Sequence, residues 1–400
     1  MKLDLWGFEA SPFLLKVEAL LNCRGIEFRR LPRDGGRGEN LLAAVRLIRA
    51  RHAGRIRRYP AMDALDEYPS VPFLIVGGRD IQYDSSSIAL WLDEQLPSDA
   101  PPFYPLEPVA GFLARLIDEA FDEYGLYMVH HQRWVCSAAD NVMGETTAGE
   151  LSRLLPPFSA ANIARKLSRR QVRRCPYLFS VAPAGFKPAS AAGLAAERVP
   201  PSLTGFPPTH ALLEQSWGAT IVAMEQLLAA QPYVLGNRFT LADASIYGQL
   251  SMNLIDPTTA RNLMHRAPRT YQWLLDIRDA RHRGSAGELF VSPALQPLLQ
   301  LIMASFAPLM VQNEQAYQRA VAGGETVFNE AAFDRGLALY DGELQGHPFR
   351  AVVKTFQVVV WRELRQRWSS LEDSARDELK SILPDSHWLC GDDSAQGLIS

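Results

Sequence analysis

The polar residues best placed for chemistry stand at the predicted starts of helices. Ser11 precedes Pro12 and an apolar helical repeat, and the pair Asp84-Ser85 follows two short apolar runs. A serine or aspartate at such a position accepts a hydrogen bond from an otherwise unpaired N–H group of the first helical turn. From the residues alone, we therefore expect Ser11, Asp84 and Ser85 to cap helices. Any binding role of these residues would be additional to capping.

The cysteines and histidines show no spacing typical of a metal centre. The four cysteines are widely spaced, with no CxxC pair, which argues against a disulfide framework and for a reducing compartment. Cys23 lies in an apolar stretch and is expected in the core. His130 and His131 are adjacent, so on a helix they point to different faces and cannot share a metal as an i, i+4 pair would. We expect no metal site, and a packed or surface role for both histidines.

Length and composition indicate an ordinary soluble protein of more than one domain. Four hundred residues exceed what one hydrophobic core usually serves. The net charge of −3 gives no bulk electrostatic reason to expect nucleic acid or an anionic membrane as partner. The N-terminus lacks the apolar region of a signal peptide, and no run approaches the ~20 apolar residues of a transmembrane segment. The expected location is cytoplasmic.

The first hundred residues alternate strand and helix patterns. Residues 1–31 predict a strand, a helix that begins after Ser11 and ends at Gly25, and a second strand. Residues 71–95 predict a hairpin that turns at Gly77-Gly78 and leads into a helix. The order β-α-β then β-β-α is the thioredoxin-like arrangement.

Residues 33–70 form a long insert with a strongly basic piece. A cationic amphipathic helix there could bind phosphate, a membrane surface or an acidic partner. The alternative is a solvated helix face with a buried apolar stripe. The stripe would be Leu41, Leu42, Val45 and Ile48, and the arginines are Arg46, Arg49, Arg51, Arg55, Arg57 and Arg58.

Beyond the Pro-rich linker from Pro97 to Pro105, helical patterns dominate. Residues 110–137 and 208–230 are the clearest of them. Residues 139–207 contain many Pro, Ala, Gly and Ser, which predicts an insertion of loops and short helices or a partly mobile segment. Residues 285–400 predict a further extension, with helical patterns near 293–320, 330–342 and 348–381.

Two motifs in this order resemble glutathione transferases. The first is VPFLIVGGRDIQYDSSSIAL at residues 71–90. The second is GNRFTLADA at residues 236–244, where Thr240 and Asp243 form a capping box. The resemblance covers roughly residues 1–97 and, interrupted by the insertion, about 105–280.

This resemblance implies an α/β thioredoxin-like N-terminal domain followed by an all-α helical domain and a helical C-terminal extension. The domains would be a glutathione-binding domain at 1–97 with the insert at about 33–70, an all-α domain at 105–284 with the insertion at about 139–207, and the extension at 285–400. The extension has no counterpart in the two-domain family.

The resemblance also implies a glutathione site. Val71 would offer its backbone to the cysteinyl part, Pro72 would be cis, Ser85 would bind the γ-glutamyl carboxylate, and Asp84 would face the ligand's amino group. Capping alone remains the alternative for Asp84 and Ser85. Ser11 would be the catalytic residue whose hydroxyl donates to the glutathione thiolate, and it would serve as a helix cap as well or instead.

Two departures from the family narrow the chemistry. Trp6 and Phe8 stand near the end of the first strand, where several classes carry a catalytic tyrosine. A serine rather than a cysteine precedes Pro12, and disulfide exchange needs a protein thiolate. The resemblance also implies that the first long helix lines the acceptor pocket, with Tyr124, Tyr127 and Trp134 as candidates, and core packing is the alternative for each of them.

The sequence therefore predicts a cytoplasmic glutathione transferase-like protein. Glutathione would be its co-substrate and a small hydrophobic electrophile its second substrate, with no nucleic acid, no transmembrane segment and a homodimer left open. The alternative is a non-catalytic binding or scaffold protein that keeps the fold without the chemistry.

Overall fold

The N-terminal part of the chain folds around a mixed β-sheet. The computed structural model describes residues 2–57, 71–96, 100–188 and 193–390. The described strands lie in the order β2-β1-β4-β5-β3. β1 is parallel to β2, β4 is antiparallel to β1 and β5, and β3 is parallel to β5 at the edge. Their bounds are Leu3–Trp6 (β1), Arg29–Leu31 (β2), Ile56–Arg57 (β3), Phe73–Val76 (β4) and Asp80–Tyr83 (β5).

Side-chain alternation along the strands separates two cores. Leu3, Leu5 and Leu74 join the main core with helices α1 (Pro12–Cys23) and α3 (Ser85–Gln95). Phe73 and Ile75 face the other side, where helix α2 (Arg37–His52) packs. This is the period of two that a strand covered on both faces requires. The predicted thioredoxin-like order is confirmed, and Cys23 is buried in the core as expected.

The apolar stripe predicted for α2 is wrong. Leu41, Leu42 and Ile48 are exposed, whereas Ala43 and Leu47 are buried. The cause is Asn40, which is fully buried. Its amide donates to the carbonyls of residues 32, 35 and 153 at 2.9, 3.1 and 3.3 Å. These hydrogen bonds fix the rotation of the helix, because a buried amide without partners would be costly. Residue 58 and the rest of the insert to residue 70 lie outside the described residues.

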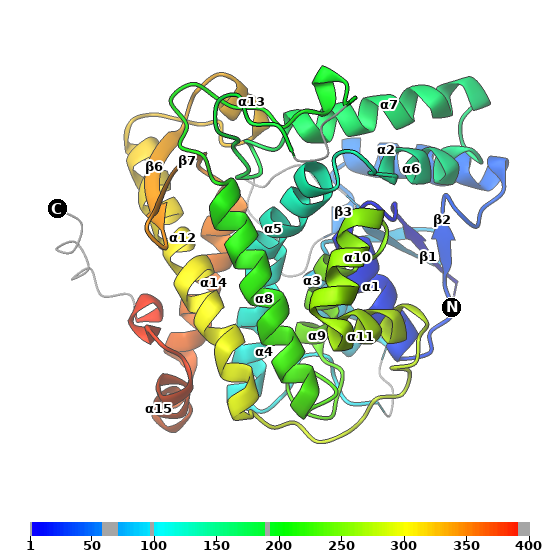
Figure 1. Ribbon diagram of the computed structural model, residues 1–400. Coiled ribbons are helices and arrows are strands. Elements are labelled where there is room, and N and C mark those ends of the chain that lie inside the picture. Colours follow the sequence, from blue (N-terminus) through cyan, green and yellow to red (C-terminus); the bar gives the residue numbers. More distant parts are fainter. Residues whose placement is uncertain (1, 58–70, 97–99, 189–192, 391–400) are drawn as a thin grey trace.

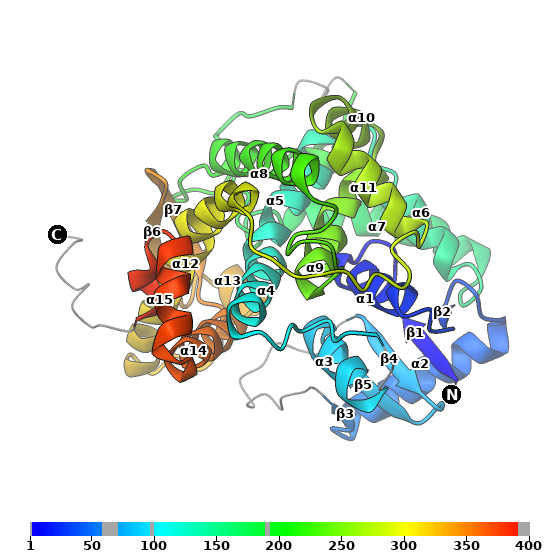
Figure 2. The same ribbon diagram turned by 90° about the horizontal axis from the view of Figure 1, so that it is seen from below.

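A long helix runs through the centre of the molecule, between the sheet on one side and the last helices on the other (Figures 1 and 2). It is continuous over residues 108–136 and alternates α-helix with two π-helical segments. Its parts are α4 (Pro108–Ala120), η1 (Phe121–Gly125), α5 (Leu126–His131) and η2 (Gln132–Cys136). The linker before it is described from residue 100 on, and Asp93 accepts from its backbone at Phe103 and Tyr104, both at 3.0 Å.

The remaining helices of the predicted all-α domain surround α4 and α5. They are α8 (His210–Ala230), α9 (Leu241–Leu250), α10 (Pro257–Arg266) and α11 (Pro268–Arg278). The predicted capping box at the start of α9 is present: Asp243 accepts from Thr240 N at 2.9 Å. Its second oxygen accepts from Val234 N at 2.8 Å, which ties the preceding turn to the helix.

The insertion is more helical than predicted. It contains α6 (Met143–Leu151) and α7 (Pro157–Arg173), and most of the basic run at 165–174 lies on α7. Figure 1 shows α6 and α7 in the upper right of the view, and the turn after α6 contacts α2, because Asn40 donates to the carbonyl of Arg153 at 3.3 Å. The prediction of short helices is therefore wrong for α7, which is 17 residues long. No glycine follows Pro157 within this helix, and glycine is a residue that disfavours a helix interior. Residues 189–192 lie outside the described part.

The extension is helical as expected, with one hairpin that the sequence analysis did not predict. β6 (Leu339–Leu344) pairs with β7 (His347–Val352) across Gln345-Gly346. Both turn residues have positive φ, 51° and 76°, as a two-residue type I′ turn requires. The helical pattern predicted near 330–342 and 348–381 is thus wrong over the hairpin. The helices are α12 (Gln296–Ala322), α13 (Glu330–Asp334), α14 (Thr355–Ser370) and α15 (Asp373–Ile382).

The extension shares the main core, which runs from Leu3 to Leu389. Phe112 of α4 meets Trp368 of α14 edge to face at 5.4 Å between ring centroids. In the described residues, the segment 293–322 around α12 is the one helix long and apolar enough to cross a membrane by length and composition. Because α12 packs against α8, α14 and β6, it fits a buried core helix. The domain boundaries given above stay a prediction.

Candidate functional site

A cavity of about 340 Å³ lies where the N-terminal sheet meets the central helix. That volume is within the range of about 300–1,000 Å³ typical of small-molecule sites. All five residues singled out in the sequence line it: Ser11, Val71, Pro72, Asp84 and Ser85. The fold therefore brings together residues that are separated by up to 74 positions in the sequence.

Ser11 caps α1 and keeps its hydroxyl proton available. Its Oγ accepts from Leu14 N at 3.3 Å, and Pro12 occupies the first helical turn as predicted. The side chain is largely buried, and its O–H is donated to no other described residue. A hydroxyl can donate one hydrogen bond while it accepts another. Ser11 can therefore cap the helix and donate into the cavity at the same time.

The loop before Ser11 is held by the insertion, which the sequence analysis did not foresee. Glu9 N donates to both carboxylate oxygens of Glu150 on α6, at 3.2 and 3.1 Å. Arg30 of β2 donates to the same carboxylate at 2.7 Å. Burial raises the pKa of Glu150, and the nearby Arg30 acts against that rise. No local sequence signal links Glu150 to Glu9, because the contact spans 141 positions.

Another wall of the cavity consists of Val71-Pro72, which directly follow the insert, and the start of α3. The Val71–Pro72 bond is cis as the resemblance implies, and Val71 lies just before β4. Asp84 caps α3 by accepting from Ser87 N at 2.8 Å. Its φ of 73° is unusual for a residue with a side chain, and such backbone positions cluster at ligand sites. Ser85 is the first residue of α3, where the helix presents N–H groups that lack partners within the helix.

The central helix supplies the opposite wall. Tyr127 and Trp134 line the cavity as expected. Tyr124 does not: its hydroxyl hydrogen-bonds to Ser216 Oγ of α8 at 2.8 Å, on the far side of the helix. His130 also lines the cavity, with Nε2 at 3.4 Å from Gln171 Oε1 of α7. Burial lowers the pKa of His130 to about 3, so its imidazole is neutral at pH 7.

Two cavity residues come from the extension. Lys354 and Phe356 stand at the start of α14. Lys354 Nζ donates to Tyr127 Oη at 2.7 Å and to the carbonyl of Tyr177 at 3.1 Å, and it lies 4.5 Å from each ring centroid. A cation over an aromatic face is attracted by the ring's quadrupole. No signal in the sequence marks Lys354, since its partners lie 227 and 177 positions away.

A buried charge cluster lies beside the cavity, and its member Asp122 lines it. Lys16 of α1 donates to Asp122 Oδ2 at 2.7 Å and to Ser86 Oγ at 2.8 Å, and it pairs with Asp118. Burial raises the pKa of Asp122 to about 7, although the ammonium of Lys16 acts against that rise. The cluster joins α1, α3 and the central helix, so it sets the position of both helix starts that carry the candidate residues.

Comparison with protein-family models finds a match for the N-terminal part of the chain. Residues 5–101 match the family model of the glutathione S-transferase N-terminal domain. The chain is glutathione S-transferase-like in this domain. All five candidate residues lie within this transferase-like domain, whereas Tyr127, Trp134 and Lys354 lie outside it. A search of curated proteins found no match to the chain.

The solved structures that the chain matches include the following three. The β-etherase LigF from Sphingobium sp. strain SYK-6 is 16% identical, with a TM-score of 0.41 over 74% of this chain and 97% of that one. A glutathione S-transferase from Rhodospirillum rubrum F11 is 13% identical, with a TM-score of 0.34 over 74% and 91%. One from Methylobacterium radiotolerans, in complex with glutathione sulfonate, is 17% identical, with a TM-score of 0.36 over 73% and 98%.

Proposed function

We propose that this protein binds glutathione in the cavity and conjugates its thiolate to a small apolar electrophile. The observation that carries the proposal is the composition of the cavity. Ser11, Val71-Pro72 and Asp84-Ser85 of the transferase-like domain line one side, and aromatic residues of the central helix line the other. A tripeptide and an apolar acceptor would meet between these two sides.

The glutathione half of the proposal assigns each group a partner by its chemistry. The N-terminus of α3 suits a carboxylate, because the unpaired N–H groups and the helix dipole favour negative charge. Ser85 adds a hydroxyl donor there, and the carboxylate of Asp84 would face the ammonium of the γ-glutamyl group. Val71 would pair its backbone with the cysteinyl part, as a strand edge pairs with an extended peptide.

The sulfur would lie at the start of α1. A free thiol has a pKa of about 8.5, and the thiolate is the nucleophile. The Ser11 hydroxyl, which donates to no other described residue, would donate to the thiolate and lower that pKa. A hydrogen bond to a charged group contributes about 1.5–3 kcal/mol, which corresponds to about 1–2 pKa units.

The acceptor side is largely aromatic, and it contains the buried cations Lys354 and Arg133. Tyr127, Trp134 and Phe356 would contact the electrophile, and Lys354 would face an electron-rich group on it. The presence of extension residues here also favours a second candidate function, a non-catalytic glutathione-binding scaffold, because the extension takes up part of the acceptor side. Both functions require glutathione binding, but only the first includes turnover of an electrophile.

The test uses two substitutions of Ser11. Ser11→Gly removes the hydroxyl and costs the helix only a few tenths of a kcal/mol, because glycine is tolerated at the N-cap. Ser11→Thr keeps both the hydroxyl and the cap. We expect turnover of a model aryl halide in wild type and Ser11→Thr. In Ser11→Gly, the pKa of the bound thiol, followed by ultraviolet absorbance of the thiolate, should rise by about 1–2 units.

Two results would change the assignment. Glutathione binding without turnover in the wild type would favour the scaffold. Turnover with the same thiol pKa in all three proteins would remove Ser11 from the chemistry and leave it as a helix cap.

A further inference from the structure

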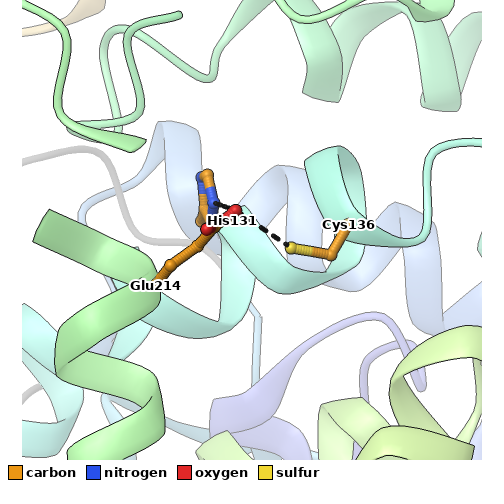
Figure 3. A group of neighbouring side chains, drawn as sticks. All are labelled: His131, Cys136 and Glu214. Carbon is orange, nitrogen blue, oxygen red and sulfur yellow. Dashed lines mark hydrogen bonds and ion pairs between the residues drawn. The ribbon is translucent and has the colours of Figure 1, made fainter. Parts of the chain in front are cut away.

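A group of metal-ligating side chains lies on the side of the central helix that faces α8. His131, Cys136 and Glu214 point toward one another across the gap between the two helices (Figure 3). His131 Nε2 lies 3.5 Å from Glu214 Oε1, and Cys136 Sγ lies 3.9 Å from the same oxygen. The three ligand atoms all lie within 4.8 Å of one another. None of the three residues lines the cavity described above.

The two distances to the Glu214 oxygen are close to the edges of a metal coordination tetrahedron, and the His131 and Cys136 ligand atoms lie within 4.8 Å of each other. With bonds of about 2.0 Å to nitrogen and oxygen and about 2.3 Å to sulfur, the N···O edge is about 3.3 Å and the O···S edge about 3.5 Å. Shifts of a few tenths of an ångström would therefore let the Glu214 oxygen share a metal ion with His131 Nε2 and with Cys136 Sγ. Imidazole nitrogen, thiolate sulfur and carboxylate oxygen are the ligands that zinc takes in proteins.

The π-helical segment explains how two residues five positions apart come to share a face. In an α-helix, residues five apart point about 140° away from each other. In η2 the hydrogen bonds run from residue i to i+5, as Ser137 N to Gln132 O at 3.0 Å shows, so residues five apart stand one turn above each other. His131 and Cys136 thus face α8 together. This geometry was not visible in the sequence, where an α-helix was assumed.

The surroundings of His131 suit a role as a metal ligand. Its Nδ1 is 2.8 Å from Ser180 Oγ, which leaves Nε2 for the metal. A ligating histidine usually gives its second ring nitrogen such a partner, which fixes the ring's orientation. The Glu214 side chain is 55% exposed and Cys136 is half-buried, so an ion can enter from solvent and water can fill the fourth position.

We propose that His131 Nε2, Cys136 Sγ and the Glu214 carboxylate form a Zn²⁺ site with an open fourth position. When the metal binds, the thiol of Cys136 loses its proton to solvent and a sulfur–metal bond forms. The ion would join His131 at the end of α5 and Cys136 of η2 to Glu214 of α8. The site does not depend on glutathione, so its test is separate from that of the proposed function.

The experiment titrates the full chain, freed of metal with a chelator, with Co²⁺ and then with Zn²⁺. Cobalt reports a thiolate ligand through a charge-transfer absorption band. We compare the wild type with Cys136→Ser, Glu214→Gln and the control Cys390→Ser, which removes the exposed thiol. Circular dichroism of the metal-free proteins checks the fold, and Glu214→Gln changes a side chain exposed enough to leave the fold intact.

The proposal predicts the band in the wild type and in Cys390→Ser, and its displacement by Zn²⁺. The band should be lost in Cys136→Ser, and Glu214→Gln should bind cobalt about tenfold or more weakly. A wild type without the band would overturn the proposal. A band that survives in Cys136→Ser, or that disappears in Cys390→Ser, would also overturn it, because the metal would then be held elsewhere.

Discussion

The buried Lys16 cluster gives the sharpest prediction about what holds the candidate site in place. The Lys16 side chain is 1% exposed, and those of Asp118 and Asp122 are 0% and 8% exposed. Replacement by methionine fills a similar volume but leaves two carboxylates in the interior without their cation. Removing one partner of a buried ion pair costs about 3–5 kcal/mol.

The lower end of that range is expected at neutral pH. Burial already raises the pKa of Asp122 to about 7, so without Lys16 this carboxyl takes up a proton instead of remaining charged. Asp118 keeps other partners, including Ser86 at 2.8 Å and Arg115 at 3.2 Å. We therefore predict that Lys16→Met lowers the free energy of unfolding by about 3 kcal/mol.

Urea unfolding followed by circular dichroism measures this loss. Lys2→Met is the matched control, because Lys2 is 59% exposed and its nearest carboxylate is 4.0 Å away. The control should lose less than about 1 kcal/mol. Adding Asp118→Asn and Asp122→Asn to Lys16→Met should recover part of the stability, since the charges left unpaired are then removed. A Lys16→Met protein as stable as the control would refute the reasoning.

Two further predictions concern buried hydrogen bonds. Asp243→Ala leaves the buried amides of Val234 and Thr240 without an acceptor, and each such amide costs about 1–3 kcal/mol. Thermal unfolding should show the loss, and Thr240→Ser, which keeps the cap, should remain close to wild type. Burial lowers the pKa of His282, whose Nε2 donates to the carbonyl of Ala19 at 2.9 Å. The unfolded chain then binds a proton that the folded one does not, so stability should fall as pH drops below about 6.5. His282→Gln should lessen that slope in urea titrations at a series of pH values, and an unchanged slope would contradict the assignment.

Local patterns predicted most of the transferase-like domain and the start of α9. The helix starts at Ser11 and Asp84 and the capping box at Thr240 depend on residues a few positions apart, so the sequence contains the whole signal. The rotation of α2 could not be predicted in this way. It depends on Asn40, whose partners include a carbonyl 113 positions away.

The same distinction between local patterns and long-range contacts applies to the candidate site. The sequence located its N-terminal half, because two motifs resemble a known family. It did not reveal Lys354, Phe356 or Glu150, which reach the site or its supporting loop only through long-range contacts. Nor did it indicate η2, because π-helical segments have no strong sequence pattern.

Glutathione titration by isothermal calorimetry, on the wild type, Ser85→Ala and the exposed control Ser369→Ala, tests the central claim most directly. The wild type and the control should release heat that fits a single class of site. Ser85→Ala should bind about tenfold or more weakly, because one hydrogen bond to a charged group is lost. No heat with the wild type, or equal affinity in all three proteins, would contradict a glutathione site at the start of α3.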